Sequence, residues 1–600
     1  MRIEPLEGWQ PTSRTLSLPT ITRACGTVPK RAGCPPNWRI SVRLDNKKSR
    51  EIDTIMTRLV TPRPTYAEVY ESFQWNLPEK MNIAWEICDR HAENPDRLAL
   101  IHHVGDRIDT YSFRDIQRLA NRFANVLVGI GMTAGERLMV YLPQHPATAV
   151  AHIACWKAGL ISIPTSILFG VDGLEYRLNH ADVTTVVTNR ENLPKLLEAQ
   201  SLAPSLKHIF VIDGAAPPGV HDFYALLERA SDRFSTLMVS PDTPAMINYT
   251  SGTTGWPKGT LQGHRIVYGH IPGLEVLFDF YPAAGDRMWS PADWAWLGGI
   301  GNMLLGGWFH GTPLLVFPMA GFDPELTMRM MGEHQIRNAF LTPTMFKLLK
   351  PHAPLVERYD VKLRSIISGS EAVGRDLLEN MLEMFGAVIN EGFGQTEANV
   401  LMGNCSRLGH FRIGSLGGAL PGHIADIMDD DGNMLPPGTV GNLVFKAPDP
   451  VMMLRYWNDP EATAKKFNGD WLITGDLAHM DEDGFYWFQG RADDVITSSG
   501  YRIGPTEIED AVLRHPAVKL AAAIGVPDKD RTEIIRAYVV LAEGTEPSDE
   551  LADEIRKSVR DRLAKHEYPR EIRFVADLPM TTTGKILRRE LRDQAKSEIA

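Results

Sequence analysis

The chain has 600 residues, of which 44% are hydrophobic, 23% charged and 8% aromatic. This is ordinary globular composition, and at about 150 residues per domain it suggests roughly four units rather than a small binding module, a coiled coil or a disordered chain. A net charge of -11 and a pI near 5.9 give no basic footprint for nucleic acid, and no apolar run of about 18 residues predicts a transmembrane segment. The five scattered cysteines, without metal-ligand spacing, favour a reducing compartment, so we expect a cytoplasmic protein.

The first 55 residues differ from the rest. They hold ten basic and five acidic residues, a net of +5, which leaves -16 for the remainder. They show no sustained periodicity and no apolar segment after a basic start, so they are not a secretory signal, and their acidic residues count against a transit peptide. We expect residues 1–55 to be a disordered extension or the product of an upstream start, with Met56 as the true start.

From about residue 80 the pattern alternates between helix and strand. Ser112 followed by Asp115 resembles a capping box, and apolar residues at helical spacing from Ile116 to Leu127 predict a helix that ends near Gly129. The pattern then predicts strands at 138–142, 160–163, 186–188, 209–212 and 245–249, and a helix at 147–157. Successive β-α units of this kind imply a mainly parallel sheet that is buried on both faces.

The rhythm changes after about residue 496. The pattern predicts helices at 507–514 and 550–564, and strands at 520–524, 537–541 and 572–575. This indicates a separate small α+β domain. The fold class is therefore α/β, with a large, multi-lobed N-terminal domain followed by a small C-terminal one.

One loop concentrates groups that suit a polyphosphate. The run 249–259 reads Tyr-Thr-Ser-Gly-Thr-Thr-Gly-Trp-Pro-Lys-Gly and follows an apolar strand. Its glycines let backbone N–H groups approach phosphate oxygens, its hydroxyls donate hydrogen bonds, and Lys258 supplies a positive charge. Composition alone would equally fit a flexible surface loop. Pro257 before the lysine and Gly259 after it do not fit a Walker A motif, which disfavours a P-loop NTPase.

The same run closely resembles the phosphate loop of the acyl-adenylate-forming superfamily, which includes acyl-CoA synthetases, adenylation domains of nonribosomal peptide synthetases and luciferases. Five further motifs match in order: NEGFGQTE at 390–397, TGD at 474–476, GRADD at 490–494, SSGYRIGP at 498–505 and TGK at 583–585. The resemblance covers about residues 80–595. The SSGYRIGP motif and PADWAW at 291–296 are most similar to the medium-chain acyl-CoA synthetase branch.

The resemblance implies a domain plan and a reaction. It implies a large AMP-binding domain over 56–489, a hinge at 490–495 and a small, mobile domain over 496–600. In such enzymes a carboxylate attacks the α-phosphate of ATP to give acyl-AMP and pyrophosphate, and the thiol of coenzyme A then displaces AMP. The implied partners are a small carboxylic acid, ATP, Mg²⁺ and coenzyme A, while the oligomeric state is not readable from the sequence.

The resemblance also assigns nucleotide-binding residues. Glu397 would bind Mg²⁺, Thr396 would donate to the α-phosphate or acyl oxygen, and Asp476 would accept hydrogen bonds from the ribose hydroxyls. Arg491 is expected at the ribose and phosphates. The remaining expected ATP contacts are Thr250, Ser251, Gly252, Thr253, Thr254, Gly255, Lys258, Ser370, Glu371, Ala372, Glu391, Gly392, Phe393, Gly394 and Gln395. Taken alone, the QTE and TGD motifs would be a helix start and a plain turn.

Further roles fall at the C-terminal end. Lys585 matches the catalytic lysine that the small domain brings to the carboxylate and α-phosphate, and an isolated lysine in such a loop would otherwise be solvated. Acylation of Lys585 would remove its charge. Asp493 matches the hinge residue of the domain rotation, although an exposed aspartate paired with Arg491 is the simpler interpretation. The expected coenzyme A contacts are Ser499, Gly500, Tyr501 and Arg502.

The acyl pocket is less readable. Trp294, Trp296, Gly298 and Gly394 are its expected lining, although core packing explains the tryptophans equally well. Acetyl-CoA synthetases carry a tryptophan directly before QTE where this chain has Gly394, so acetate is not expected to be the best substrate, and medium-chain, branched and aromatic acids stay open. Two alternatives are an enzyme that delivers to a carrier protein, which no following carrier domain supports, and a non-catalytic relative, which would be expected to lack Lys585, Glu397 or Asp476.

Overall fold

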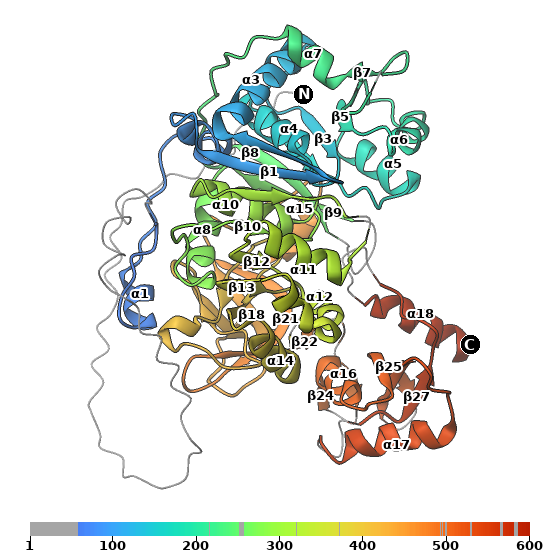
Figure 1. Cartoon of the computed structure of the whole chain (residues 1–600). Helices are drawn as coiled ribbons and strands as arrows, with labels where there is room; N and C mark the ends of the chain where they lie inside the picture. The colour runs from blue at the N-terminus through green and yellow to red at the C-terminus, as the bar shows by residue number, and fades with distance from the viewer. Residues whose placement is uncertain are drawn as a thin grey trace. The chain divides into compact units, whose positions relative to one another are not determined.

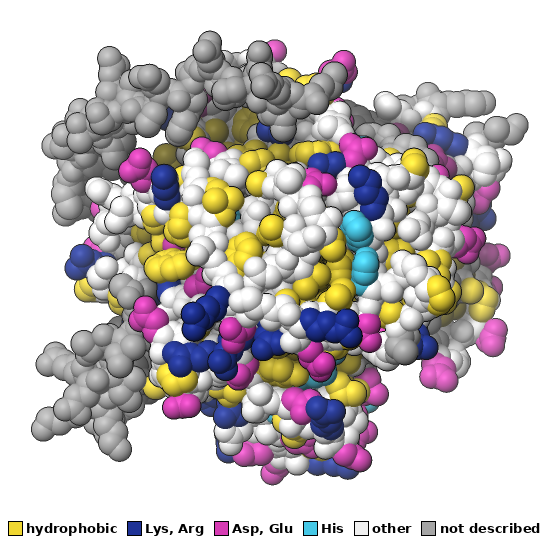
Figure 2. All heavy atoms as spheres, turned by 90° about the horizontal axis from the view of Figure 1, so that it is seen from above, with side chains coloured by type: hydrophobic (Ala, Val, Ile, Leu, Met, Phe, Trp, Pro, Cys, Tyr) yellow, Lys and Arg dark blue, Asp and Glu magenta, His cyan; other side chains and the backbone are white. Residues whose placement is uncertain are grey.

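The computed structural model describes residues 58–600, except 215, 251–256, 320, 371–372, 493, 495, 499–500, 529–530, 564–567, 581–585 and 600. The expectations for residues 1–55 and for a start at Met56 lie outside this range. Within the described part of the chain, no helix combines the length and the hydropathy needed to cross a membrane. Figure 2 shows Lys and Arg side chains interspersed with Asp and Glu over the face that it presents.

An eight-stranded sheet carries the phosphate loop. Six consecutive strands of this sheet pair in parallel, and the other two, β9 and β19, run antiparallel to their neighbours. In spatial order the strands are β19 (Arg455–Tyr456), β9 (Lys258–Gly263), β8 (Pro244–Thr250), β4 (Ile161–Pro164), β3 (Arg137–Tyr141), β5 (Thr185–Thr188), β6 (His208–Val211) and β7 (His221–Asp222). The predicted parallel sheet is confirmed, with strand ends within a residue or two of the predicted ones.

A nine-stranded sheet forms the second large layer. Its central strands, from β14 to β1, are parallel, and antiparallel strands close both edges. In spatial order they are β16 (Gly418–Ala419), β15 (Met402–Gly403), β14 (Val388–Phe393), β13 (Ser365–Ser368), β12 (Asn338–Phe340), β10 (Met288–Trp289), β11 (Leu314–Val316), β1 (Leu98–Val104) and β2 (Arg107–Ser112). Because parallel strands end at one edge, the loops after β13 and β14 lie together.

Helices cover these sheets (Figure 1). The helices before the five-stranded sheet are α1 (Tyr66–Ser72), α2 (Ile83–Ile87), α3 (Phe113–Gly129), α4 (Pro146–Lys157), α5 (Val171–His180), α6 (Leu193–Gln200), α7 (Phe223–Arg229), α8 (Ile266–Leu277), α9 (Leu297–Gly299), α10 (Gly306–Phe309), α11 (Pro324–Glu333), α12 (Pro343–Leu349), α13 (Pro354–Arg358) and α14 (Arg375–Phe385). One large apolar core includes residues of α3, α4 and α8, while separate cores lie under α11 to α14 and under α5 and α6.

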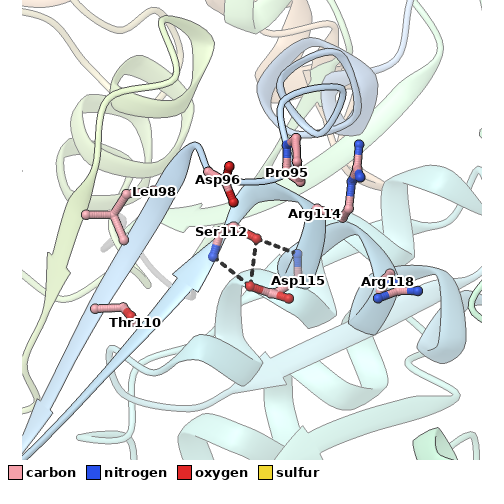
Figure 3. A pocket seen from close by; sticks show the side chains of 8 residues that line it. All are labelled: Pro95, Asp96, Leu98, Thr110, Ser112, Arg114, Asp115 and Arg118. Atoms are coloured by element: carbon pink, nitrogen blue, oxygen red, sulfur yellow. Dashed lines mark hydrogen bonds between the residues drawn. The ribbon is translucent and has the colours of Figure 1, made fainter.

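The predicted capping box at the start of α3 is confirmed. The amide of Asp115 donates to Oγ of Ser112 at 3.2 Å, and the amide of Ser112 donates to Oδ2 of Asp115 at 2.9 Å. These groups lie in an open surface recess that Arg114 and Arg118 also line (Figure 3). Because Ser112 and Asp115 hydrogen-bond to each other, helix capping explains these polar groups in the recess, and no ligand is needed to explain them.

A five-stranded antiparallel sheet completes the large domain. Its strands are β17 (Ala425–Met428), β18 (Gly441–Lys446), β21 (Trp471–Met480), β20 (Phe467–Asn468) and β22 (Tyr486–Arg491), and helix α15 (Pro460–Lys465) precedes β20. Strand β21 pairs with both β18 and β22, and Asp476 faces Arg491 across the second pairing. This sheet therefore supplies the TGD motif and the first residues of the GRADD motif.

The C-terminal domain is α+β, as predicted. Its sheet consists of β24 (Tyr501–Ile503), β23 (Ile496–Ser498), β26 (Thr532–Leu541), β25 (Val518–Asp528) and β27 (Glu571–Phe574), with helices α16 (Pro505–Leu513), α17 (Asp549–Arg560) and α18 (Arg588–Ile599). Separate apolar cores fill the two faces of this sheet. The helix predicted at 550–564 is wrong at its end, because α17 stops at Arg560.

Candidate active site

The phosphate loop connects the adjacent antiparallel strands β8 and β9. Thr250 and Lys258 are register partners at the mouth of this hairpin, and residues 251–256 between them lie outside the described part of the chain. The base of the loop is held from α5, since the Tyr176 hydroxyl donates to the carbonyl of Pro257 at 2.8 Å and Nδ1 of His180 lies 2.9 Å from the Tyr249 hydroxyl. The hairpin thus places Lys258 at a fixed point beside the loop.

The QTE loop follows directly after β14. It is anchored from the eight-stranded sheet, because Nε2 of Gln262 donates to the carbonyl of Thr396 at 2.7 Å. The backbone of Met453 donates to the carbonyl of Glu397 at 2.7 Å. These two contacts hold the backbone of the loop at Thr396 and Glu397. The orientation of the Glu397 side chain is therefore set by the contacts of its carboxylate.

Tyr456 contacts both Glu397 and Lys258. The hydroxyl of Tyr456 donates to Oε1 of Glu397 at 2.5 Å, and Nζ of Lys258 lies 5.2 Å from the centre of the Tyr456 ring. Burial, and then the negative charge of Glu397, raise the pKa of Tyr456, so the hydroxyl stays a proton donor. Among the described residues, only Oε1 of Glu397 receives a side-chain hydrogen bond, and Oε2 suits a hard cation such as Mg²⁺.

The TGD motif lies across from the QTE loop. Asp476 is buried, its Oδ2 accepts a hydrogen bond from Nε2 of Gln395 at 2.6 Å, and its Oδ1 pairs with Arg491 at 3.2 Å. Gly475 lies within β21, where the pairing with β18 is irregular. It has φ of 78°, and a Cβ there would lie 3.5 Å from the Arg491 guanidinium, so this position favours glycine. The pairing of Arg491 with Asp493 stays a prediction, because Asp493 lies outside the described residues.

A second lysine joins this cluster. Lys466 follows α15 and donates from Nζ to Oε1 of Gln395 at 3.2 Å and to the carbonyl of Thr474 at 3.0 Å. Burial lowers the pKa of Lys466, while the charges of Glu397 and Asp476 act in the opposite direction. Neither Lys466 nor Tyr456 was predicted from the sequence, since both lie outside the matching motifs and no local pattern marks them.

The ends of β13 and β14 come together as the parallel sheet requires. A Cβ on Gly369 would lie 2.7 Å from the carbonyl oxygen of Gly392, so the backbones before Ser370 and at Gly392 are in contact. Ser370 is exposed and has φ of 83°, which is unusual for a side chain other than glycine. The expected adenine-flanking segments are thus adjacent, while Glu371 and Ala372 lie outside the described residues.

Glu391 has a structural partner. It is buried on β14, and its Oε1 accepts a hydrogen bond from the amide of Val373 at 3.0 Å, while its Oε2 finds no partner. Burial raises the pKa of Glu391 to about 7. Its contact with ATP stays a prediction, and the contact seen here ties the segment after Ser370 to the end of β14.

The predicted acyl-pocket residues come from α9 with the segment before it and from the start of the QTE loop. Trp294 is almost fully buried, whereas Trp296 is half-buried and makes an edge contact with Phe169 at 6.1 Å between ring centres. A Cβ on Gly298 would lie 3.4 Å from the Phe340 ring, and one on Gly394 would lie 2.2 Å from the amide nitrogen of Val400. Both glycines therefore border closely packed neighbours.

Hydrogen-bonded polar side chains lie next to these residues, since Asn399 borders the Cβ position of Gly394. Nε2 of His270 is 3.1 Å from Oδ1 of Asn302, and Nδ2 of Asn399 is 3.0 Å from Nδ1 of His270. Asp293 accepts from Oγ of Ser166 at 2.7 Å and from the amide of Ala295 at 3.0 Å. Because these bonds engage both oxygens of its carboxylate, Asp293 is a poor anchor for an amino group.

Several predicted residues cannot be placed. Asp493, Ser499, Gly500 and Lys585, like Ser251 to Gly255 of the phosphate loop, lie outside the described residues. Tyr501 and Arg502 lie on β24, where only the backbone is described. The described cluster consists of Lys258, Gln395, Glu397, Tyr456, Lys466, Asp476 and Arg491, and it is assembled from all three sheets of the large domain.

One group of potential metal ligands lies away from this cluster. The ligand atoms of His103, Glu333 and His334, on β1 and at the end of α11, lie within 4.8 Å of one another. However, Nδ1 of His103 and Nε2 of His334 are only 2.7 Å apart, whereas two ligands of one tetrahedral Zn²⁺ lie about 3.3 Å apart. The two imidazoles satisfy each other by a direct hydrogen bond, and no metal is needed to explain them.

Comparisons with known proteins identify the family of the chain. The model of the AMP-binding enzyme family matches residues 88–457, and that of the AMP-binding enzyme C-terminal domain matches residues 507–585. An acetyl-coenzyme A synthetase of Bacillus subtilis is 34% identical over 88% of this chain and 94% of its own length. The mitochondrial acyl-coenzyme A synthetase ACSM5 of the mouse is 33% identical over 86% of this chain and 91% of its own.

Solved structures show the same fold. The anthranilate CoA ligase AuaEII, in complex with anthranoyl-AMP, aligns with a TM-score of 0.80 and 28% identity over 87% of this chain and 99% of its own. A benzoate CoA ligase from Burkholderia xenovorans aligns with a TM-score of 0.77 and 28% identity, over 85% of this chain and 100% of its own. The chain belongs to the AMP-binding enzyme family. Within it, its relatives make it an AMP-forming acid–thiol ligase of the acyl-CoA synthetase class.

Proposed function

We propose that this acyl-CoA synthetase activates a medium-chain, branched or aromatic acid, and that the cluster around Glu397 and Asp476 is its nucleotide site. The observation that carries the proposal is the convergence of Gln395 and Glu397 of the QTE loop with Asp476 of β21 and Arg491 of β22. The contacts are 2.6 Å between Gln395 and Asp476 and 3.2 Å between Asp476 and Arg491. Such convergence of charged groups is typical of a binding site for a charged ligand.

The chemistry requires both charge neutralisation and alignment. A carboxylate and a triphosphate repel each other, so Lys258 and the hydroxyls of the phosphate loop would hold the β and γ phosphates, and Arg491 would approach the ribose and phosphates. Thr396 would donate to the α-phosphate or acyl oxygen. Glu397 would hold Mg²⁺ through its available oxygen, and the ion would supply neutralising charge at the phosphates.

The proposed binding mode for the ribose rests on Asp476. Gln395 donates to one oxygen of this carboxylate and Arg491 to the other. The two ribose hydroxyls would donate to the same carboxylate, which as an ionised group accepts several hydrogen bonds. The expected adenine contacts are the adjacent segments at Ser370 and Gly392, with Phe393 and Gly394 beyond them.

The second half-reaction would need the small domain. The domain plan, with a hinge at 490–495 and a mobile domain at 496–600, stays part of the proposal, as do Asp493 as the pivot, Lys585 as the adenylation lysine and Ser499 to Arg502 as coenzyme A contacts. In this scheme the thiol of coenzyme A attacks the acyl carbonyl, and AMP leaves.

Gly394 supports an acid larger than acetate. Its Cβ position is only 2.2 Å from the amide nitrogen of Val400, so this backbone cannot accommodate a tryptophan before QTE that would shorten the pocket. One relative is named an acetyl-coenzyme A synthetase, and solved neighbours are named benzoate and anthranilate CoA ligases. The substrate is therefore proposed from Gly394 rather than from these names.

A panel of acids tests the proposal. Pyrophosphate release would be measured with acetate, octanoate, isovalerate and benzoate, with and without coenzyme A, and the thioester would be identified by mass spectrometry. We expect thioester from at least one larger acid with a kcat/KM above that for acetate. A preference for acetate would contradict the pocket assignment, and pyrophosphate release without any thioester would favour delivery to a carrier protein.

The proposed site of action is the cytoplasm. Three of the five cysteines, Cys88, Cys155 and Cys405, fall in the described part of the chain, and all three are free and buried. Free thiols are typical of a reducing compartment. Fractionation of native cells with an antibody against the protein tests the assignment, and recovery with an organelle or the cell exterior would contradict it.

A further inference from the structure

Lys466 touches both halves of the candidate nucleotide site but belongs to none of the motifs. It lies between α15 and β20, and its Nζ reaches the QTE loop at Gln395 and the TGD turn at Thr474, at 3.2 and 3.0 Å. Its backbone carbonyl accepts from the amide of Ile473, directly before the TGD motif, at 2.8 Å, so only its side chain reaches the QTE loop. A single side chain therefore bridges two segments that are about 80 residues apart in the sequence.

These contacts fix the orientation of the Gln395 amide. A lysine ammonium can only donate hydrogen bonds and a carboxylate can only accept them. Because Oε1 of Gln395 faces Lys466, its Nε2 must face the other way, where it donates to the carbonyl of Thr474 at 2.9 Å and to Oδ2 of Asp476 at 2.6 Å. In the reverse orientation, Nε2 of Gln395 would face the ammonium of Lys466, so two donors would oppose each other. Oε1 would face the Thr474 carbonyl and the Asp476 carboxylate, so acceptors would oppose acceptors.

The Gln395 amide in turn orients Asp476. One oxygen of this buried carboxylate is held by Gln395, and the other pairs with Arg491 at 3.2 Å. With both oxygens held, the plane of the carboxylate is set. The proposed contact of Asp476 with the two ribose hydroxyls depends on this orientation.

The charges around Lys466 agree with such a role. Glu397 and Asp476 attract its ammonium group, whereas Arg491 and Lys258 repel it, and the side chain is half-buried. A cation held against two like charges is stable only because the carboxylates and its hydrogen bonds offset the repulsion. Loss of this lysine would leave Oε1 of Gln395 without its charged partner.

We propose that Lys466 is a positioning residue for nucleotide binding, which acts through Gln395 to orient the Asp476 carboxylate toward the ribose hydroxyls. The inference rests on the proposed function, since it takes Asp476 as the ribose-binding residue. Lys466 itself need not touch the nucleotide. The property that it controls is discrimination between nucleotides with and without the 2′ and 3′ hydroxyls.

Calorimetric titration of the full-length enzyme with Mg²⁺ and either ATP or 2′,3′-dideoxy-ATP measures this property without an acid substrate. Two hydrogen bonds to a charged acceptor predict that the wild type binds ATP about 100-fold more tightly than the dideoxy analogue. In Lys466→Met this ratio should fall to about tenfold or less, whereas Lys466→Arg, which can still donate to Gln395 and Thr474, should recover most of it. Lys465→Met, at the exposed neighbouring lysine, should keep the wild-type ratio.

A second variant keeps the test independent of how Lys466→Met folds. Gln395→Glu preserves the partner of Lys466 but places a carboxylate against Asp476, so the ratio should also fall. If the wild type does not distinguish the two nucleotides, Asp476 does not bind the ribose and the proposed function fails at this point. If the wild type does distinguish them and both variants keep its ratio, the relay from Lys466 is wrong although the role of Asp476 stands.

Discussion

Nε2 of Gln395 lies 2.6 Å from Oδ2 of Asp476, and this contact joins the end of the nine-stranded sheet to the five-stranded sheet. The two residues come from motifs about 80 positions apart. Their contact means that the QTE loop and the TGD turn are held as one unit, to which the eight-stranded sheet adds Lys258 and Tyr456. A site assembled from three sheets can align a nucleotide with a second substrate without reorganising the backbone.

Lys585 is expected to act in only one half-reaction. Lys585→Ala should abolish the formation of acyl-AMP, because the point charge at the α-phosphate is lost, yet largely spare thioester formation from supplied acyl-AMP. The two half-reactions would be measured separately, with Lys557→Ala at an exposed lysine of α17 as the control. Equal loss of both half-reactions would refute the division of roles.

The hydroxyl of Tyr456 should matter for the use of Mg²⁺. Tyr456→Phe removes a hydrogen bond to a charged group, for which about 1.5–3 kcal/mol is typical, so kcat/KM for adenylate formation should fall at least about tenfold. The Mg²⁺ concentration at half-maximal rate should also change.

A matched control exists for this substitution. Tyr359 is partly buried and donates to Oε1 of Glu325 at 2.6 Å through a solvent-exposed hydrogen bond, so Tyr359→Phe removes the same kind of bond elsewhere. It should leave adenylation and its Mg²⁺ dependence unchanged. Similar kinetics for the two variants would contradict the assignment of Glu397 to the metal.

Gly394 is expected to tolerate no side chain. The added Cβ of Gly394→Ala would lie 2.2 Å from the amide nitrogen of Val400, so the loop must shift, and the free energy of unfolding should fall by about 1–3 kcal/mol. Urea denaturation measures the change. Gly129→Ala is the control, since its Cβ meets nothing within 4 Å, and a wild-type midpoint for Gly394→Ala would show that the packing is looser than described.

Glu391 should make stability depend on pH. Its folded-state pKa is raised to about 7 from the ordinary 4.5, so between these pH values the folded state binds more protons than the unfolded state. The contribution of Glu391 to stability is therefore lost as pH rises from about 4.5 to about 7, by up to about 3 kcal/mol.

Glu391→Gln tests this dependence. The glutamine keeps an oxygen to accept from the amide of Val373, but it does not titrate, so the variant should gain stability relative to wild type at pH 7.5 and not at pH 4.5. Glu383→Gln, at an exposed position of α14, is the control. A constant difference between Glu391→Gln and wild type at both pH values would contradict a titrating Glu391.

The sequence predicted the elements and motifs well, and for identifiable reasons. The capping box at Ser112 and the strands of the parallel sheet are local signals, in which residue type and spacing alone determine the structure. The motifs around Lys258, Glu397 and Asp476 were recognised because each is short and contiguous. Their proximity does not follow from one sheet, since they belong to the eight-, nine- and five-stranded sheets and are connected by side-chain contacts such as that of Gln395 with Asp476.

Other features of the site depend on tertiary contacts, which no local sequence pattern predicts. Tyr456 reaches Glu397 only because β19 adds to the edge of β9, and Lys466 reaches Gln395 only because α15 ends beside the TGD turn. The end of α17 was misplaced because the charged helical pattern continues past Arg560.

The transfer of isotope from the acid to AMP tests the central claim most directly. With a carboxylic acid labelled with ¹⁸O in both oxygens, attack of the carboxylate on the α-phosphate forms a bridging bond, and attack of coenzyme A on the carbonyl leaves one labelled oxygen on AMP. We predict AMP with one ¹⁸O per turnover, together with unlabelled pyrophosphate and one equivalent of acyl-CoA. Labelled inorganic phosphate together with ADP would instead indicate an acyl phosphate, and would contradict the account.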